Sequence, residues 1–340
     1  MGKRATQVRG AELDLLRRIR RRARAGGGVV LGIGDDCALL HIRPGEEVAV
    51  TTDLSIDGRH FRVGLHPPEV VGHRTLARGL SDLAAMGARP IAAFVSLGLP
   101  AGLAKAPGRG RSWMTRFYDG LLSLADRHKT ALAGGDLAES PVALADIVLV
   151  GGVPRGRALL RSGARPGDGI YVTGALGSAA AGLAELVRMT AETRVKVGRG
   201  DVVPARLARL LGAHLHPEPR LAQGEWLRKH EAATAAIDLS DGLSTDLAHI
   251  CEESGVAAEL EEAALPLGPG ATLEQVLHGG EDYELLFTAG AGQRVPLRIA
   301  GVPVTRIGRI VPARKGRAQM MLQIAGRLEP LEPRGWQHFT

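Results

Sequence analysis

Cysteine and aromatic residues are both scarce in this sequence of 340 residues. The two cysteines, Cys37 and Cys251, do not have the spacing of a zinc site, and so few cysteines indicate a reducing compartment. Phenylalanine, tryptophan and tyrosine make up only 3% of the chain, whereas glycine occurs 46 times. Because 45% of the residues are hydrophobic, we predict a core of Ala, Val and Leu against closely packed backbone, in about two domains.

Long apolar runs are absent as well. No stretch approaches the roughly 20 apolar residues that cross a bilayer, and the N-terminal residues lack the apolar segment of a signal peptide. Together with the reduced cysteines, these absences predict a cytoplasmic protein without a membrane partner.

The charge is unbalanced in one direction, with a net charge of +7. The densest basic block, 17–24 (RRIRRRAR), overlaps Leu13, Leu16 and Ile19 at helical spacing, which predicts an amphipathic helix with a solvated basic face. No aromatic residues interleave with these arginines to stack on bases, so we predict that the protein does not bind nucleic acid. The positive field would instead attract phosphorylated substrates.

Several nucleotide-binding motifs are missing. The sequence contains neither a GxxxxGK[ST] loop nor a GxGxxG turn after a strand, and the catalytic motifs of protein kinases are absent. If this chain binds ATP, we therefore expect metal ions held by carboxylates, rather than a phosphate-cradling loop, to neutralise the phosphates.

Acidic residues occur instead at the ends of apolar, β-branched runs. The runs 29–33 and 48–52 read as strands followed by Asp35, Asp36 and Asp53, and the Pro-Gly turn between them predicts a hairpin that makes the strands neighbours. Clustered carboxylates repel each other unless a cation lies between them, and oxygen ligands suit Mg²⁺. A plain turn-capping role for the first two aspartates is the alternative interpretation.

The same arrangement recurs later in the chain. Asp238 and Asp241 flank a strand-to-helix turn in which Ser240 suits the helix N-cap, but capping explains one of these residues rather than all three. Asp136 follows a Gly-Gly turn, and Asp82 lies off the apolar stripe of a helix, where periodicity alone predicts contact with solvent. Six aspartates at element ends could thus hold two or more Mg²⁺ ions between phosphate oxygens: Asp36, Asp53, Asp82, Asp136, Asp238 and Asp241.

Apolar periodicity places strands and helices in alternation through both halves of the chain. We predict helices over 69–86, 113–128, 179–189 and 241–253, strands over 90–99, 146–152, 170–173 and 235–239, and a connection over 188–203. The pattern changes after residue 152. We therefore predict an α/β (α+β) fold with an arm over 1–28, an N-terminal domain of mixed sheet and helices over 29–152, and a C-terminal α/β domain over 153–340.

A set of short motifs resembles one enzyme family. The motifs run from Val29 almost to the C-terminus: GIGDD (32–36), TTD and GRHF (51–53, 58–61), LSDLAAMGARP (80–90), AGGD (133–136), GRALLRSGARPGD (156–168), IDLSDGLSTDL (237–247) and GGEDYELLF (279–287). GIGDD alone is weak evidence, but SDLAAMGA together with the last two motifs is specific. The sequence resembles the thiamine-monophosphate kinases, within the superfamily of aminoimidazole ribonucleotide synthetase and selenophosphate synthetase.

The resemblance implies a reaction and an assembly. It implies ATP-dependent phosphorylation of thiamine phosphate to thiamine diphosphate, by in-line transfer assisted by several Mg²⁺ ions. It also implies an N-terminal domain that forms a homodimer and a C-terminal domain that closes over the nucleotide.

The resemblance also implies roles for individual residues. The implied metal ligands are Asp36, Thr51, Thr52, Asp53, Asp82, Asp136, Asp238 and Asp241, of which Asp36, Asp53, Asp82 and Asp241 are catalytic. The implied nucleotide contacts are Gly135, Asp136, Arg161 and Ser240, and the implied contacts of thiamine phosphate are His60, Glu281 and Trp336. Asp82 is then a bridge between metals, against the solvent contact that periodicity predicts. For Trp336 the alternative is a tail residue packed on the core, and for His60 an ordinary histidine at a strand end.

Departures from the family pattern and rival functions complete the prediction. Gly79, Leu137 and Arg59 replace residues that are more usual in the family, but none of these changes removes a carboxylate. One rival function is an ATP-dependent synthetase of the same superfamily, which would release ADP and free phosphate. A second is a magnesium–nucleotide sensor without turnover, and a third is an RNA-binding protein with steeply salt-dependent affinity.

Overall fold

The structure of this protein is a computed structural model that describes residues 17, 19–21, 27–105, 110–199, 201–314, 316 and 319–336. The predicted arm and most of the predicted basic helix lie outside these described residues. Contacts divide the chain into two compact units. Unit 1 holds the chain up to Gly79, Pro90–Gly152 and a short piece from Val197; unit 2 holds Leu80–Arg89, Val153–Lys196 and the chain from Asp201 onwards. The domain limits proposed from the sequence stay a prediction.

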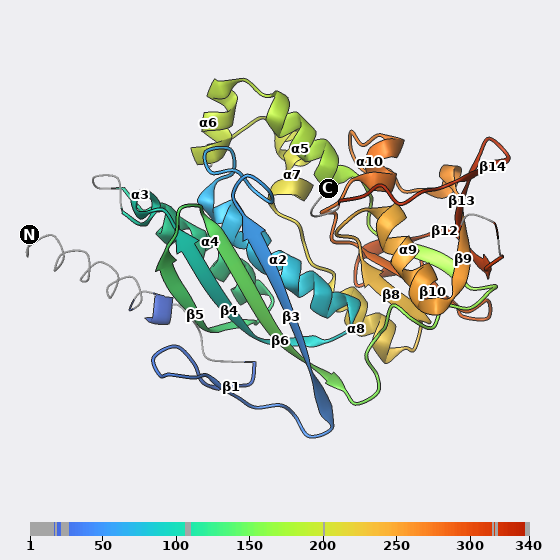
Figure 1. Cartoon of the computed structure of the whole chain (residues 1–340), viewed down its shortest axis with the longest axis horizontal. Helices are drawn as coiled ribbons and strands as arrows, with labels where there is room; N and C mark the ends of the chain where they lie inside the picture. The colour runs from blue at the N-terminus through green and yellow to red at the C-terminus, as the bar shows by residue number, and fades with distance from the viewer. Residues whose placement is uncertain are drawn as a thin grey trace, which may run out of the picture. The chain divides into compact units, whose positions relative to one another are not determined.

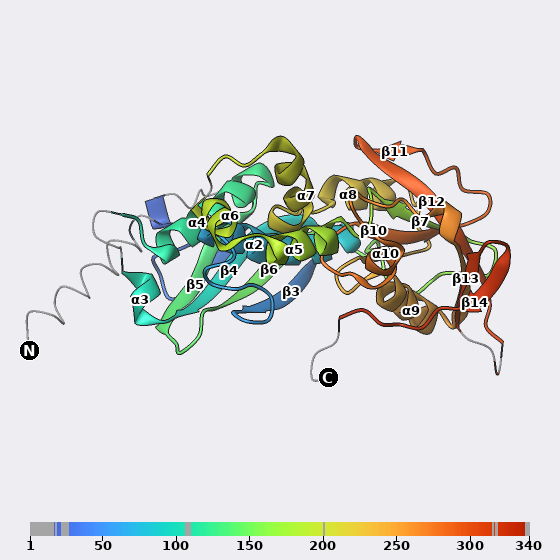
Figure 2. The same cartoon turned by 90° about the horizontal axis from the view of Figure 1, so that it is seen from above.

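Unit 1 is built around a four-stranded sheet with the strand order β3-β6-β4-β5, in which β4 and β5 are parallel. Helices α2 and α4 lie on one face of this sheet (Figures 1 and 2). A two-stranded antiparallel sheet, β1-β2, places Val29 and Leu40 against the buried Ile91 and Ala92 of β4. The described elements are β1 (Val29–Leu31), β2 (Leu39–Leu40), β3 (Glu46–Ile56), α2 (Pro68–Ala85), β4 (Arg89–Leu99), α3 (Ala101–Ala104), α4 (Trp113–Arg127), β5 (Ala131–Glu139) and β6 (Leu144–Pro154).

The helices α2 and α4 approach each other through glycine. A β-carbon added to Gly72 would lie 1.9 Å from the carbonyl oxygen of Phe117, and one added to Gly120 would lie 1.8 Å from the carbonyl oxygen of Glu69. Beside this contact, Arg116 donates two hydrogen bonds to Glu69, at 2.7 and 2.8 Å. The close approach of backbone expected from the high glycine content is present at this helix pair.

Two local predictions for unit 1 are wrong. The strand that begins at Val29 pairs with β2, whereas β3 pairs with β6, so the Pro-Gly turn does not join a hairpin of neighbouring strands. Gly134, Gly135 and Asp136 lie inside β5 rather than in a turn after it. Glycine usually interrupts a strand, but the pairing of β5 with β4 continues through these residues as far as Glu139.

Unit 2 contains an eight-stranded sheet among its described residues, with the order β14-β13-β9-β12-β7-β10-β8 and with β11 paired to β12. Most neighbours are antiparallel, but β13 and β9 are parallel. The elements are β7 (Gly169–Thr173), α5 (Ser178–Arg188), α6 (Ala191–Arg199), α7 (Ala205–Leu215), α8 (Leu221–Lys229), β8 (Ala235–Asp238), α9 (Leu243–Ser254), β9 (Val256–Glu261), η1 (Glu262–Ala264), α10 (Leu273–His278), β10 (Leu285–Ala289), β11 (Arg298–Ile299), β12 (Val302–Pro312), β13 (Met320–Ile324) and β14 (Arg327–Pro330).

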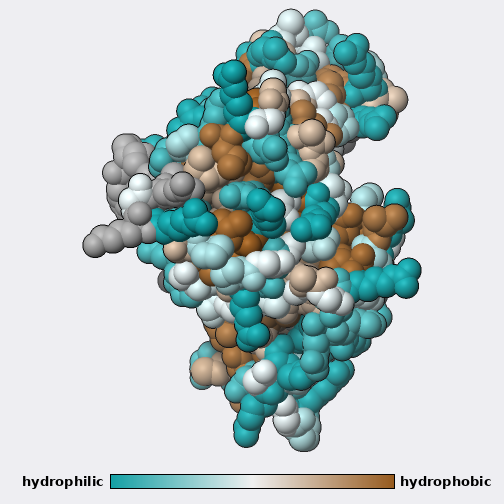
Figure 3. Space-filling model, turned by 90° about the vertical axis from the view of Figure 1, so that its right-hand side faces the viewer, coloured by the Kyte–Doolittle hydropathy of each residue, from teal (hydrophilic) through white to brown (hydrophobic). Residues whose placement is uncertain are grey.

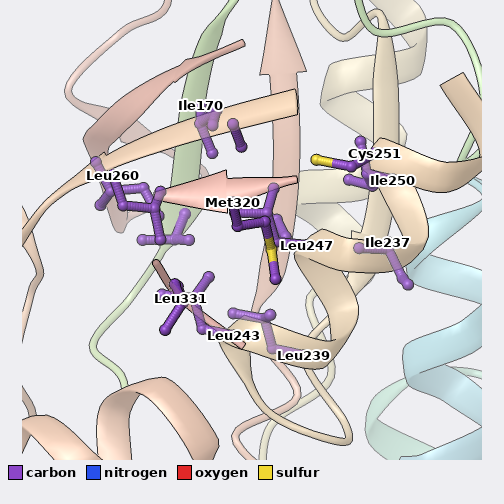
Figure 4. Packing of buried hydrophobic residues seen from close by; sticks show 14 of the residues in the cluster. Ile170, Ile237, Leu239, Leu243, Leu247, Ile250, Cys251, Leu260, Met320 and Leu331 are labelled. Atoms are coloured by element: carbon purple, nitrogen blue, oxygen red, sulfur yellow. The ribbon is translucent and has the colours of Figure 1, made fainter. Parts of the chain in front are cut away.

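The core of unit 2 lies between α9 and the sheet. Leu243, Leu247 and Ile250 share one face of α9, as their spacing predicts, and all three are at most 1% exposed. Figure 4 shows these side chains together with residues of β7, β8, β9 and β13. Burying a leucine side chain stabilises the fold by about 1.5–3 kcal/mol, so this face fixes α9 and the loop before it.

The predicted mixed α/β fold class is confirmed, and the long periodic segments are helices and strands as expected. One segment is a correction: the predicted connection over 188–203 contains α6. The surface drawn in Figure 3 is largely hydrophilic, and its apolar residues gather in several separate patches, as is usual for a surface in water. Among the described residues, none of the helices combines the length and the apolar character that a membrane span requires.

Candidate functional site

The end of β8 forms a polar corner in unit 2. Asp238 is the last residue of β8 and is only 3% exposed. The fully buried Ser81, near the end of α2, donates a hydrogen bond from Oγ to Asp238 Oδ2 at 2.7 Å. Asp82, the next residue along the helix, is half-buried, so the solvent-facing position that periodicity predicts is only partly correct.

The loop after β8 is held in place by Asp246, which lies in the first turn of α9 and is 1% exposed. Its Oδ2 accepts hydrogen bonds from the backbone N–H groups of Asp241 and Gly242, at 3.2 and 3.0 Å. Burial, and then the negative charges of Asp238 and Asp241, raise the pKa of Asp246 well above its usual range. Asp246 therefore fixes the course of the loop that carries Asp241.

The C-terminal segment of the described chain returns to this loop. The backbone N–H of Gly335 donates to Thr245 Oγ1 at 3.0 Å, and that of Trp336 donates to the carbonyl oxygen of Asp241 at 3.0 Å. A β-carbon at Gly335 would lie 2.1 Å from the same carbonyl oxygen, so the approach requires glycine. Trp336 is 46% exposed, which is more than a tail residue anchored in the core would be. The structure thus brings Trp336 and Asp241 together.

The motif Gly279–Glu284 lies beside the same loop, because the N–H of Glu281 donates to the carbonyl oxygen of Ser240 at 2.8 Å. Glu281 and Tyr283 have left-handed backbone angles, with φ of 69° and 51°. Such angles cost about 1–2 kcal/mol for a residue other than glycine, and they concentrate at functional sites. The Glu281 carboxylate lies 3.6 Å from Nδ1 of the buried His214 on α7.

The other two acids of this motif have structural partners. Asp282 accepts hydrogen bonds from the N–H groups of Gly177 and Ala179 at the start of α5, at 2.6 and 3.1 Å. Burial raises the pKa of Asp282 to about 7. Glu284 is buried and accepts two hydrogen bonds from Arg220, at 2.6 and 2.5 Å, and one from Thr173 at 2.6 Å.

In unit 1, Asp53 and His60 lie at the end of β3 and in the turn that follows it. Arg78 Nη2 donates to Asp53 Oδ1 at 2.5 Å, and the two side chains are 16% and 23% exposed. His60 Nδ1 accepts a hydrogen bond from the N–H of Ile56 at 3.1 Å, which fixes its ring at the strand end. Hydrogen bonds within unit 1 thus restrict the orientation of both side chains.

The other two predicted acidic ligands of unit 1, Asp36 and Asp136, are exposed to solvent. Asp36 is exposed and its N–H donates to Asp35 Oδ1 at 2.9 Å, as in a plain turn. Asp136 is exposed on β5, where its Oδ1 accepts from the N–H of Leu137 at 2.8 Å. The neighbouring Gly135 has φ +144°, and a β-carbon there would lie 2.0 Å from the carbonyl oxygen of Val95. Only glycine fits this position, which explains why glycine precedes the acid.

Alternation along β3 separates the two threonines. Thr51 and Asp53 are half-buried on one face of the strand, whereas Thr52 is exposed on the other. The hydroxyl groups of Thr51 and Thr52 therefore point in opposite directions. Gly79 does not leave a polar gap: a β-carbon there would lie 2.9 Å from Leu149 Cδ1, so a side chain at this position would point at the apolar sheet.

Arg161 lies away from the polar corner within unit 2. Its carbonyl oxygen accepts from Ser254 Oγ at 3.3 Å, at the C-terminal end of α9, whereas Asp241 precedes the N-terminal end. A helix of 12 residues is about 18 Å long. Contact between Arg161 and a nucleotide phosphate stays a prediction.

The predicted metal ligands are distributed over the two units, with Asp36, Asp53 and Asp136 in unit 1 and Asp82, Asp238 and Asp241 in unit 2. Within the described ranges, no group of three or more His, Cys, Asp or Glu side chains lies close enough to hold a metal ion. Magnesium binding and the residue roles assigned from the sequence stay predictions.

The sequence prediction gave no role to several residues that order the candidate site. Asp246 and Asp282 lie inside recognised motifs, and an acid in the first turn of a helix is a known cap signal, so Asp246 had a usable local signal. Ser81 also lies inside a recognised motif, but its bond to Asp238 forms only through the tertiary fold, as do the bonds of Arg220 and Thr173 to Glu284.

Comparison with known proteins agrees with the fold. Residues 34–153 match the family described as AIR synthase related protein, N-terminal domain. The thiamine-monophosphate kinase of Escherichia coli K12 is 40% identical over 324 residues, which is 92% of this chain and 93% of the relative.

Solved structures give the same result. The thiamine-monophosphate kinase of Stenotrophomonas maltophilia K279a superimposes with a TM-score of 0.75 at 38% identity, covering 91% of this chain and 95% of the other. AaThiL complexed with AMPPCP and TMP gives a TM-score of 0.73 at 30% identity, with 96% and 97% coverage. Since both the sequence and the fold match over nearly the whole length, this chain belongs to the thiamine-monophosphate kinase family of phosphotransferases.

Proposed function

We propose that this protein transfers the γ-phosphoryl group of ATP to thiamine phosphate, forming ADP and thiamine diphosphate. The observation that carries the proposal is the near full-length similarity to thiamine-monophosphate kinases, including AaThiL, whose solved complex contains AMPPCP and TMP. The polar corner of unit 2 supports it, because Asp238, Asp241 and the half-exposed Trp336 lie on one loop and its neighbour.

The proposed reaction needs no general base. The acceptor is a phosphate oxygen that is largely ionised near neutral pH, since the second pKa of a phosphate monoester is about 6. The difficulty is to hold two polyanions with the attacking oxygen in line with the leaving group, so positioning and charge neutralisation dominate the barrier.

The proposed metal ligands suit magnesium in their chemistry, because all of them are oxygen donors. In unit 2 we assign Asp82, Asp238 and Asp241 to Mg²⁺, and the bond from Ser81 orients Asp238 for this role. In unit 1 we assign Asp36, Thr51, Thr52, Asp53 and Asp136. Bound Mg²⁺ would neutralise negative charge on the phosphate oxygens.

The other proposed contacts divide between nucleotide and acceptor. Gly135, Ser240 and Arg161 are assigned to ATP, with the guanidinium of Arg161 suited to two phosphate oxygens. Trp336 is assigned to stacking on the thiamine rings, and Glu281 to the cationic or amino-bearing part of thiamine. His60 completes the acceptor site in this proposal.

We also propose that two copies of the chain associate through unit 1. The edge strand β3 exposes Val48, Val50 and Leu54 on one face, at 53%, 60% and 44%. An apolar row on a sheet edge favours association with another chain. The expected mass in light scattering is that of a dimer, and Val50→Lys should shift it to a monomer.

The free thiols of Cys37 and Cys251 support a cytoplasmic location.

Product analysis tests the proposed reaction. Purified protein is mixed with ATP, MgCl₂ and thiamine phosphate, and the products are separated and quantified. We expect one thiamine diphosphate for each ADP, a loss of at least about a hundredfold in rate for Asp82→Ala, and no comparable loss for the exposed control Asp201→Ala. ADP with free phosphate would instead support the synthetase function, and magnesium-dependent ATP binding without turnover would support a sensor.

A further inference from the structure

A cationic cavity lies in unit 2, at α7 and the loop before α10. It has a volume of about 560 Å³ and is lined by Arg206, Arg209, Leu210 and the segment Leu267–Gly270. None of these residues has a role in the proposed reaction. Ligand-binding pockets usually have volumes of about 300–1,000 Å³, so the cavity is large enough for a small organic molecule.

The walls of the cavity combine positive charge with apolar surface. Arg206 and Arg209 are three residues apart on α7, which places their side chains on the same face of the helix. Leu210, Leu267 and Pro269 supply apolar surface, and Leu267 is 49% exposed. Helix α7 packs against α5, and the two lie side by side in Figures 1 and 2. Helix α7 therefore contributes two arginines to a cavity that also has apolar lining residues.

Helix stability does not explain these arginines. The first turn of α7 contains no acidic residue, and a cation there opposes the helix dipole. Like charges three residues apart also repel, at a cost of a few tenths of a kcal/mol. In the part of the chain that the structure describes, neither guanidinium forms an ion pair with a carboxylate, in contrast to Arg220 with Glu284. Among the described residues, the positive charge at this cavity therefore has no carboxylate partner.

We propose that this cavity binds a small organic phosphate, with the phosphate between Arg206 and Arg209 and an apolar group against Leu210, Leu267 and Pro269. Two guanidinium forks match the oxygens of a phosphate dianion better than a single carboxylate. The site is distinct from the residues assigned to ATP and thiamine phosphate. Its occupant is an additional ligand, and the proposal does not depend on the reaction.

Phenyl phosphate is the probe, because it joins a dianion to a flat apolar ring. Binding to the full-length protein is measured by calorimetry, and its location by amide hydrogen exchange of 205–215 and 267–271. We expect slower exchange in both segments, and weaker binding of inorganic phosphate, which lacks the apolar group. The double variant Arg206→Gln/Arg209→Gln should bind phenyl phosphate at this site at least tenfold more weakly.

Two further variants give the controls. Arg155→Gln/Arg327→Gln removes the same charge from exposed positions elsewhere in unit 2 and should change the affinity less than twofold. Arg206→Lys/Arg209→Lys keeps the charge and should retain part of the affinity for phenyl phosphate. It keeps the proposal testable if the glutamine variant does not fold. Unchanged protection in the glutamine variant, or protection confined to other segments, would overturn the proposal. Turnover of thiamine phosphate is assayed without the probe, so failure of the proposed reaction is recorded separately.

Discussion

Several acidic residues at and around the candidate site of unit 2 are buried, whereas the predicted ligands Asp36 and Asp136 of unit 1 are exposed. In unit 2, Asp238, Asp246 and Glu284 are buried, and each accepts hydrogen bonds from groups that are distant in sequence or on an adjacent loop. In unit 1, Asp36 and Asp136 are exposed, and among the described residues each forms a hydrogen bond with its neighbour in the chain. Asp53, paired with Arg78, is intermediate.

The difference in burial predicts which acids contribute to stability as well as to function. Burying a carboxylate is costly unless hydrogen bonds compensate, so the acids of unit 2 are part of the fold as well as of the candidate site. The exposed acids of unit 1 remain in contact with water, so they do not need compensating hydrogen bonds. We therefore expect mutations in unit 2 to change the free energy of unfolding, and mutations of the exposed acids in unit 1 to leave it nearly unchanged.

The largest expected effect is at Glu284. Replacing Glu284 by Ala leaves the guanidinium of Arg220, which is only 19% exposed, without its carboxylate. Removing one partner of a buried ion pair typically costs about 3–5 kcal/mol, and urea unfolding should show a loss of this size. The matched control is Glu259→Ala, which breaks the more exposed pair with Arg309 and should cost less than about 1 kcal/mol. Equal losses in the two variants would contradict the comparison.

A smaller effect is expected at Asp246. Asparagine has nearly the same shape as the Asp246 side chain and keeps an acceptor oxygen for the two backbone N–H groups. Asp246→Asn should therefore change the unfolding free energy by less than about 1 kcal/mol. Asp246→Ala leaves the N–H groups of Asp241 and Gly242 unpaired and should cost about 1–3 kcal/mol. A similar cost for both variants would show that shape, rather than the acceptor, holds this loop.

Asp282 gives a pH-dependent test of the same comparison. Its pKa is raised from 3.8 to about 7 in the folded protein, so the folded state binds the proton more tightly than the unfolded state. This contribution to stability is fully present below about pH 4 and is lost as the pH rises to about 7. The free energy of unfolding of the wild type, relative to Asp282→Asn, should fall by on the order of 3–4 kcal/mol across this range. A constant difference between the two proteins would be the contrary result.

The sequence predictions were correct where a local pattern determines the element and wrong where strand pairing determines it. Elements with long periodic patterns, such as α9 with Leu243, Leu247 and Ile250, were predictable because one apolar face determines both the helix and its burial. The partner of β1 was not, because strand pairing depends on the whole sheet rather than on the turn between two strands. The sequence indicates a turn at Gly135 and Asp136 because glycine favours turns. Pairing with β4 nevertheless keeps both residues in a strand.

The candidate site was predictable where a motif is local and unpredictable where it is tertiary. The loop at Asp238–Asp241 could be placed at a strand end from its sequence alone. The hydrogen bond from Ser81 to Asp238 joins residues that are 157 positions apart, and no local pattern encodes it. The return of Trp336 to the carbonyl of Asp241 is of the same kind, although the family resemblance assigns both residues to one site.

The smallest expected effect on stability is at Asp136. Among the described residues, this exposed carboxylate accepts a hydrogen bond from the next N–H alone, so Asp136→Asn should change the unfolding free energy by no more than about 0.5 kcal/mol. If Asp136 is a magnesium ligand, the same variant should need a severalfold higher Mg²⁺ concentration for half-maximal thiamine diphosphate formation. The control is Glu139→Gln, at an exposed acid on the same strand, which should change neither quantity to this extent. Loss of stability in Asp136→Asn would end the contrast between the units, whereas unchanged stability with an unchanged Mg²⁺ requirement would remove Asp136 from the metal site.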